Sequence, residues 1–272
     1  MLRLVQLEFL KLKNTKYFWV LLSFFLLFLF AVPIGSKYFL DYLGKLGEDI
    51  TDLGIKANEL PIFDFVDIWQ NLTWVYSNFS ILLGFTVIIS VCNEYSYGTI
   101  KQNVIDGLSR KEFLWSKVGF ILTVSAITSV AVFIIGLIMG FMWSPVQGAP
   151  FIFKNIAFIP AYFLHLVAFQ LLCLIVALLI KRSGLVLAFM IFYIYVIEPI
   201  VGGILTWRYD LEWLSSFLPV NLTGNVIPIP FPKYILRETQ SFVAFSDVAI
   251  ILVFISLLIW LSVRLITKRD LS

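Results

Sequence analysis

Six long apolar runs restrict what this chain can fold into. They cover residues 17–40, 72–92, 114–143, 156–180, 185–205 and 248–266. A helix needs roughly 20 apolar residues to cross the hydrocarbon core of a bilayer, and each run reaches about that length. The strands of a membrane barrel are shorter and alternate in polarity, which these runs do not. The sequence therefore predicts an all-α, polytopic membrane protein with six transmembrane helices in a single domain, residues 1–272.

The composition supports this class and excludes others. Hydrophobic residues make up 60% of the chain and charged residues 14%, whereas a soluble domain is nearer half apolar and a quarter charged. The formal net charge of +3 is too small to suggest nucleic acid as a partner. Two cysteines and a single histidine match neither a disulfide framework nor a metal site by spacing, so we expect no metal or other cofactor on this chain.

The distribution of basic residues predicts the orientation. Thirteen of the 20 Lys and Arg residues lie in the two termini and in the second and fourth loops, and seven lie on the opposite side. The side richer in Lys and Arg faces the cytoplasm. Both termini are therefore predicted to be cytoplasmic, as an even number of spans requires. The first run is too long for a cleaved signal peptide and follows a charged leader.

The leader, residues 1–16, has the pattern of an amphipathic helix. Leu2, Val5, Phe9 and Leu12 share one face at helical spacing. We interpret the leader as an interfacial helix whose lysines lie near anionic headgroups of membrane lipids. It also serves as a positively charged anchor for the first span, and the two interpretations are compatible.

Two segments are predicted to lie outside the cell membrane. Residues 41–71 are rich in Asp and Glu, which favours a soluble and helical segment. Residues 206–241 are more apolar, and the stretch 213–232 contains too many prolines to cross the membrane as a regular helix. We expect that stretch to dip into the outer leaflet or to lie in the interface.

The loop between the second and third runs, residues 93–117, carries the most specific pattern. Glu94 stands where the second run ends, and Gly98 and Thr99 permit a tight turn or a helix break. Apolar residues then recur at helical spacing, at Ile100, Val104 and Leu108. This pattern predicts a short helix that is separated from the second span by the turn.

The same loop ends with a signal for the start of a helix. Ser109 and Glu112 have the spacing of a capping box, in which each side chain bonds the backbone of the other residue. Arg110 stands at the head of the predicted helix, and Lys117 lies where the third span begins. The loop is thus predicted to be a stiff connection between two spans.

This arrangement resembles the permease subunits of ABC type-2 exporters. In that family an acidic residue follows the second span, and a Gly-Thr pair, a Ser-Arg pair and a Ser-Lys pair precede the third. Here these are Glu94, Gly98-Thr99, Ser109-Arg110 and Ser116-Lys117. The resemblance covers nearly the whole chain in architecture, but in motif it covers this loop alone. The alternative is an ordinary cytoplasmic loop that is held in place by its positive charges.

The resemblance implies that this loop couples the protein to a separate ATPase subunit. Charge and orientation would come from Glu94, Arg110 and Lys117, the turn from Gly98 and Thr99, and packing from Ile100, Val104 and Leu108. The chain has no G-x-x-x-x-G-K-[ST] phosphate loop, so ATP and Mg²⁺ are expected on the partner and this chain is not expected to be an enzyme. The family further implies a second copy or a related permease, and a place in the bacterial plasma (inner) membrane.

Polar residues inside two runs are further candidates. Glu198 and Pro199, followed by Gly202 and Gly203, interrupt the fifth run. A carboxylate within a span is costly and is usually paired or functional, so these four residues line a transport path or a re-entrant junction. Alternatively, the helix ends early and Glu198 meets water. His165, with Gln170, is interpreted as a polar contact between helices.

Two other functions remain open from the sequence. An intramembrane enzyme would use Glu198 and His165, although few other polar residues surround them. A membrane anchor or sensor without transport activity would use the acidic outer segment. The transported substrate is not predicted.

Overall fold

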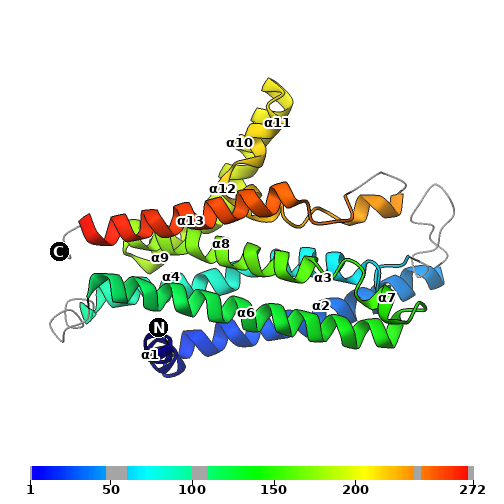
Figure 1. Cartoon of the computed structure of the whole chain (residues 1–272), viewed down its shortest axis with the longest axis horizontal. Coiled ribbons are helices and arrows are strands. Elements are labelled where there is room, and N and C mark those ends of the chain that lie inside the picture. Colours follow the sequence, from blue (N-terminus) through cyan, green and yellow to red (C-terminus); the bar gives the residue numbers. More distant parts are fainter. Residues whose placement is uncertain (1, 47–59, 100–108, 236–239, 269–272) are drawn as a thin grey trace.

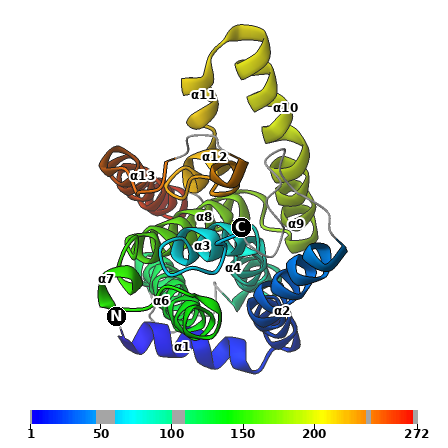
Figure 2. The same cartoon turned by 90° about the vertical axis from the view of Figure 1, so that its right-hand side faces the viewer.

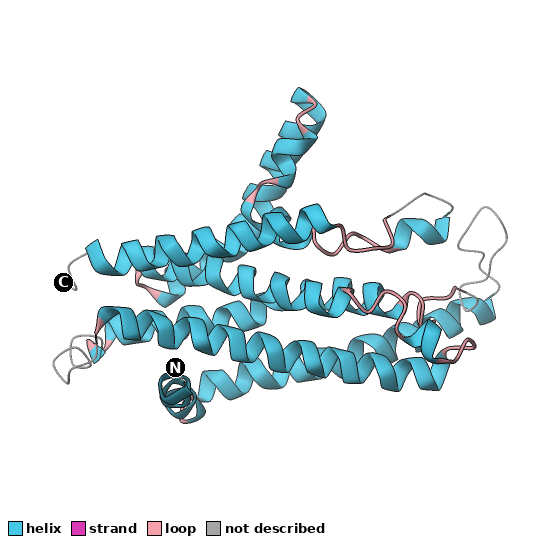
Figure 3. Cartoon of the chain, viewed as in Figure 1, coloured by secondary structure: helices cyan, strands magenta, loops and turns pink. Residues whose placement is uncertain are grey.

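The computed structural model describes residues 2–46, 60–99, 109–235 and 240–268, and these are helical with no strand among them (Figure 3). The helices are α1 (Leu2–Lys13), α2 (Lys16–Leu46), α3 (Ile68–Ser77), α4 (Ser80–Ser96), α6 (Arg110–Trp143), α7 (Ala149–Ile152), α8 (Phe158–Ile180), α9 (Ser183–Phe192), α10 (Glu198–Gly203), α11 (Glu212–Ser216), α12 (Pro219–Gly224) and α13 (Phe245–Lys268). Two π-helical turns, η2 (Tyr193–Ile197) and η3 (Ile204–Arg208), and one 3-10 turn, η4 (Phe231–Ile235), complete the described elements.

Five helical stretches are long and apolar enough to cross a membrane, and a sixth is obtained if α3 and α4 count as one span. The five are α2, α6, α8, the stretch from α9 through η3, and α13. The predicted fold class is therefore confirmed as an all-helical chain with five or six candidate spans.

The long helices form a bundle around α8. In Figure 1, α2, α4, α6, α8 and α13 run along the long axis, and Figure 2 shows α8 between α4, α6 and α13. Helix α8 contains no Asp, Glu, Lys or Arg, and it is the most buried of the five candidate spans. A helix that is apolar on all sides is suited to such a central position.

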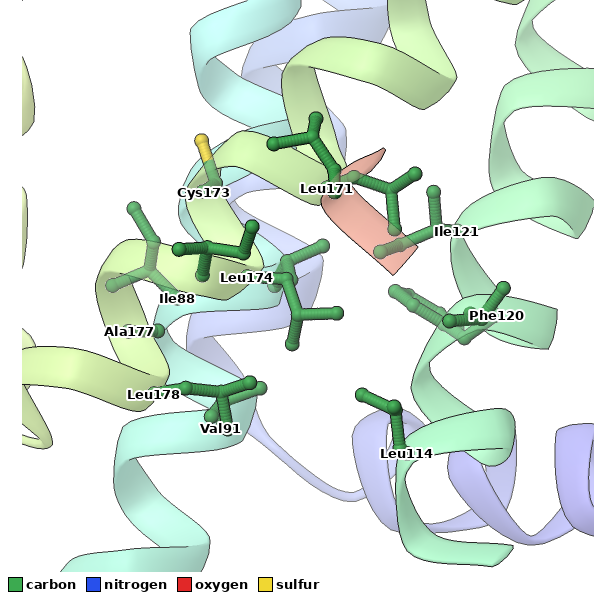
Figure 4. Packing of buried hydrophobic residues seen from close by; sticks show 14 of the residues in the cluster. Ile88, Val91, Leu114, Phe120, Ile121, Leu171, Cys173, Leu174, Ala177 and Leu178 are labelled. Atoms are coloured by element: carbon green, nitrogen blue, oxygen red, sulfur yellow. The ribbon is translucent and has the colours of Figure 1, made fainter. Parts of the chain in front are cut away.

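The core near the ends of α4 and α8 is made mainly of aliphatic side chains, together with some aromatic ones. Ile88 and Val91 from α4 face Leu174 from α8, and Leu114 and Phe120 from α6 close the cluster (Figure 4). This packing fixes the end of α4 relative to the beginning of α6. We refer to this end of the bundle, where residues 96–110 connect the two helices, as the loop end.

The second apolar run falls on two helices, which the run by itself does not reveal. Helices α3 and α4 meet at an angle of 40°, with Asn78 and Phe79 between them. The Asn78 amide donates to the carbonyl oxygens of Trp74 and Val75, at 2.9 and 3.5 Å. Such local bonds compete with the regular helical ladder and favour a helix end.

The fifth run leaves the bundle. Helix α9 begins beside α4 and α8, and α10 then rises away from the bundle while α11 returns toward it (Figures 1 and 2). The proline-rich stretch beyond it forms α11, α12 and η4, not a regular span. We call the projecting part, residues 193–218, the arm.

Helix α1 lies across the loop end of the bundle. It is seen end-on in Figure 1 and lengthwise in Figure 2. An orientation across the bundle is the one expected of an interfacial helix.

Candidate functional site

The candidate site lies at the loop end, where α1, α4 and α6 meet. Helix α6 begins with the predicted capping box. The amide of Glu112 donates to Ser109 Oγ at 3.2 Å, and the amide of Ser109 donates to Glu112 Oε2 at 2.8 Å. Both bonds satisfy amides that have no partner within the helix. The capping box is therefore confirmed, and it fixes the residue at which α6 starts.

The predicted turn after α4 is also present. Gly98 has a φ of +67°, in the left-handed region that glycine adopts without a steric cost. The Thr99 hydroxyl donates to the carbonyl oxygen of Glu94 at 3.2 Å. These two residues end α4 as an αL cap and redirect the chain.

Two turns into α6, Lys117 occupies the centre of the site. Its side chain is 2% exposed. The ammonium Nζ lies 2.6 Å from Glu8 Oε2 and 2.5 Å from Glu94 Oε1, and it donates to Ser90 Oγ at 2.9 Å. Because Glu8 belongs to α1 and Glu94 to α4, one buried cation joins three helices.

A second cation and a hydroxyl complete the cluster. Lys11, which is partly exposed, lies 3.4 Å from Glu8 and 3.5 Å from Glu94. Ser116 donates to Glu8 Oε1 at 3.2 Å. Two carboxylates are thus balanced by two ammonium groups, which is the condition for burying charges in an apolar surrounding. We call Glu8, Lys11, Glu94 and Lys117 the ion cluster.

The electrostatics of Glu8 show how the cluster is held. Burial by itself would raise the pKa of this carboxyl, because it disfavours the charged form. The ammonium groups of Lys117 and Lys11 outweigh burial, and the pKa of Glu8 is lowered below its ordinary value of 4.5. Glu8 is therefore a carboxylate at neutral pH, and α1 is attached to the bundle by a charge.

A glycine permits the close approach of α1 to α6. A Cβ atom at Gly119 would lie 2.6 Å from Val5 Cγ2, closer than side chains tolerate. Val5 is on the apolar face predicted for the leader, and Leu12 on the same face is 2% exposed. Helix α1 is consequently packed against the protein, not only laid on a membrane surface.

One atom of the ion cluster has no partner. Glu94 Oε2 is buried and accepts no hydrogen bond from any described residue. At the next residue of α4, the ammonium group of Lys181 lies 5.0 Å from the centre of the Tyr95 ring. The short loop between α8 and α9 is thereby placed next to the end of α4.

The structure brings together only some of the residues that the sequence predicted for coupling. Glu94, Gly98 and Thr99 surround the end of α4, and Arg110 and Lys117 belong to the beginning of α6. Lys117 lies in the interior and so acts within the protein. The remaining predicted residues, Ile100, Val104 and Leu108, lie outside the described residues.

Glu8 is the participant that the sequence interpretation missed. It is the only acidic residue in the leader, and it lies three residues from Val5 and four from Leu12, on the same face of α1. Its partner Lys117 is 109 residues away. A single acidic residue on the apolar face of a basic leader was the available signal, and it does not identify a partner.

Glu198 is buried and paired, at 2% exposure. Its carboxylate accepts hydrogen bonds from the backbone amides of Val220 and Asn221, at 3.1 and 2.6 Å. The carboxylate thereby ties α10 to the beginning of α12. Pro199 is exposed, on the arm.

The two glycines that follow differ in their surroundings. A Cβ at Gly202 would lie 3.0 Å from Ser215 Oγ, whereas one at Gly203 would meet only the ring of Trp207, at 3.8 Å. Gly202 therefore lies where α10 passes close to the returning helix of the arm, α11. Together with Glu198 and Pro199, these residues lie at the base and along one side of the arm.

The polar residues of α8 make the interhelical contacts that the sequence predicts. His165 Nδ1 donates to the Thr223 carbonyl oxygen at 2.8 Å, and its Nε2 lies 3.4 Å from Ser80 Oγ. Gln170 donates to Ser125 Oγ on α6 at 2.9 Å. No group of three or more metal-ligating side chains is found in the described part of the chain.

Comparison with known proteins gives a family without an assigned activity. No curated protein matches the chain in sequence. A family model described as a protein of unknown function, DUF2705, matches residues 51–272. The matched part contains Glu94, Lys117 and Glu198, and α1 precedes it. Because the match covers well over half of the chain, this protein belongs to the DUF2705 family.

Proposed function

We propose that this protein is the membrane subunit of an ATP-driven exporter of the ABC type-2 kind, and that a separate ATPase subunit drives it. The observation that carries the proposal is the buried Lys117, which holds Glu8 of α1 and Glu94 of α4 at the start of α6. The cluster lies at the two ends of the loop whose motif resembles the coupling element of that family.

The geometry at the loop end is suited to transmit a displacement of the loop to α4, α6 and α1. A force on residues 98–109 would reach α4 through Gly98 and α6 through the capping box at Ser109. The ion cluster adds α1, so the three helices would move as one body. Helix α6 has 34 residues and spans about 50 Å, so its displacement would be felt at the opposite end of the bundle.

The remaining components follow from what the chain lacks. Because the sequence contains no phosphate loop, ATP and Mg²⁺ would be bound by the partner ATPase. A second copy of this chain or a related permease would complete the translocation path. Under this proposal both termini and the loop end face the cytoplasm, and the complex resides in the bacterial plasma membrane.

The alternative of an intramembrane enzyme gains no support from the geometry. His165 and Glu198 both direct their hydrogen bonds to the backbone of residues 220–223. Their polar atoms hold the segment that contains α12, and neither bonds the other. The acidic outer segment, on which an anchor or sensor function would depend, falls largely at residues 47–59, outside the described residues.

The proposal is tested by isolating the tagged chain from its native membranes and identifying the proteins bound to it. An ATPase subunit with a phosphate loop should copurify and hydrolyse ATP in the complex. Arg110→Glu should weaken this association, while Arg208→Glu, an exposed charge reversal at η3 on the arm, should not. Copurification of no such ATPase, or equal loss in both variants, would refute the coupling assignment.

A further inference from the structure

A cavity of about 400 Å³ lies beside the break in the second span. Its walls come from α3, α4, α8, η2, α12 and the residues that follow α12. The size falls in the range of small-molecule sites. Helix α4 has 17 residues, so Ser80 lies about 25 Å along the bundle from the loop end. The cavity is thus remote from the ion cluster.

The polar side chains at the floor of the cavity already have hydrogen-bond partners within the protein. His165, Ser80 and Phe169 are buried there. The His165 Nδ1 atom donates to a backbone carbonyl oxygen, which can only accept, and Nε2 is next to the Ser80 hydroxyl. The floor therefore fixes the shape of the cavity and leaves the recognition of a ligand to the rim.

Three exposed asparagines on the rim present hydrogen-bond acceptors. The side-chain amide nitrogens of Asn78, Asn221 and Asn225 donate to the carbonyl oxygens of Trp74, Ser215 and Ser216, at 2.9, 3.2 and 2.9 Å. Because a backbone carbonyl only accepts, the atom facing it must be the amide nitrogen. The three side-chain carbonyl oxygens take part in none of the hydrogen bonds among the described residues and remain available.

The charge of the lining selects against ionic ligands. None of the residues that line the cavity is charged, so neither a phosphate nor an ammonium headgroup would find a counter-ion. The other lining residues include the aromatic Trp74 and Tyr195 and the aliphatic Ile194. Neutral acceptors beside aromatic rings match a ligand that carries many hydroxyl donors between apolar C–H faces.

We propose that this cavity binds the uncharged, polyhydroxylated headgroup of a glycolipid. Its hydroxyl groups would donate to the free carbonyl oxygens of Asn78, Asn221 and Asn225, and a sugar ring would lie against Trp74 or Tyr195. The lipid tail would continue along the exposed apolar surface at the mouth, where Ile229 is 54% exposed. This binding site does not depend on the proposed ATP-driven transport.

Two glycines provide a matched pair of variants. Gly224 lines the cavity, and a Cβ there would meet no atom within 4 Å. Gly184, near the start of α9, has equally open surroundings and is not part of the lining. Gly224→Phe has room for its Cβ and should place a phenyl ring at the cavity wall, and Gly184→Phe controls for the addition of an exposed phenyl ring.

The experiment measures lipid binding by native mass spectrometry in an amine-oxide detergent, because glycosidic detergents carry the proposed headgroup. The probes are monoglucosyl diacylglycerol, diacylglycerol and phosphatidylglycerol with identical chains, and methyl glucoside as a free sugar. Wild-type protein and Gly184→Phe should bind the glucosyl lipid about tenfold more tightly than any of the other three probes. One or two hydrogen bonds to the headgroup account for a difference of this size. Gly224→Phe should abolish the preference.

Each contrary result would overturn the proposal. Equal binding of diacylglycerol would show that only the acyl chains are recognised, and tighter binding of phosphatidylglycerol would show that the headgroup class is wrong. Equal binding of methyl glucoside would assign the site to a soluble sugar. An undiminished preference in Gly224→Phe, with unfolding temperatures unchanged in both variants, would place the lipid elsewhere.

Discussion

Replacing Lys117 by methionine should destabilise the protein more than any other single change in the ion cluster. The substitution keeps a long unbranched side chain, one atom shorter than lysine, and removes its charge. It leaves Glu8 at 2% and Glu94 at 8% exposure, with only the partly exposed Lys11, at 3.4–3.5 Å, to balance them. Breaking a buried ion pair from one side costs about 3–5 kcal/mol, because an uncompensated charge stays in a low-dielectric site.

The loss of stability expected for Lys117→Met can be compared with that of two other variants of the ion cluster. Lys11 is 44% exposed, so Lys11→Met should cost at most about 1 kcal/mol. A triple variant, Glu8→Gln, Glu94→Gln and Lys117→Met, removes all three buried charges together and should recover most of the loss, as replaced buried ion networks do elsewhere. Unfolding of the purified variants in one detergent, followed by circular dichroism, measures these differences. A Lys117→Met protein as stable as the wild type, or a triple variant less stable than the single one, would refute the reasoning.

Three further predictions concern the contacts of α1 and of Glu198. Gly119→Val should displace α1, because even a Cβ at this position would lie 2.6 Å from Val5; proteolysis between α1 and α2 should then become faster, while Gly184→Val should have no effect. The stability that the Glu8 carboxylate contributes is complete above pH 4.5, its ordinary pKa, and is lost only as the pH falls through its lower folded-state pKa. A fluorescent label on Gln6→Cys should therefore gain mobility as the pH falls through the folded-state pKa. In the Glu8→Gln background the same label should be mobile already at neutral pH. Glu198→Leu should cost about 2–3 kcal/mol by leaving two backbone amides without their acceptor, detected as faster proteolysis of residues 206–225 than in Glu212→Leu, an exposed control.

Local patterns predicted the elements of this fold well. The lengths of the apolar runs located the long helices to within a few residues at most ends, because the need to satisfy backbone groups in an apolar solvent is a property of each segment alone. The start of α6 followed from Ser109 and Glu112, which are three residues apart, and the end of α4 followed from Gly98. These signals require no knowledge of the rest of the chain.

Contacts between distant segments were not predictable in the same way. Helix α8 is apolar on every side, so its sequence does not show which face meets α4 and which meets α6. The pairing of Glu8 with Lys117 joins residues 109 positions apart. The sequence assigned Lys117 to the contact with an ATPase and gave Glu8 no partner. The departure of the arm from the bundle depends on two π-helical turns and on Glu198 bonding α12, which a run of apolar residues does not encode.

The central claim, that the loop end receives an ATPase, is tested most directly by cross-linking. Tyr97 is 79% exposed at the end of α4, and Trp207 is 90% exposed on the arm; the two native cysteines, Cys92 and Cys173, are buried and should not react. Tyr97→Cys, labelled with benzophenone maleimide and irradiated in native membranes, should form a cross-link to a chain that contains a phosphate loop, because the excited benzophenone inserts into any nearby C–H bond. Trp207→Cys, labelled in the same way, should not. If position 97 cross-links to no ATPase, or if position 207 captures the same ATPase equally well, the coupling account is contradicted.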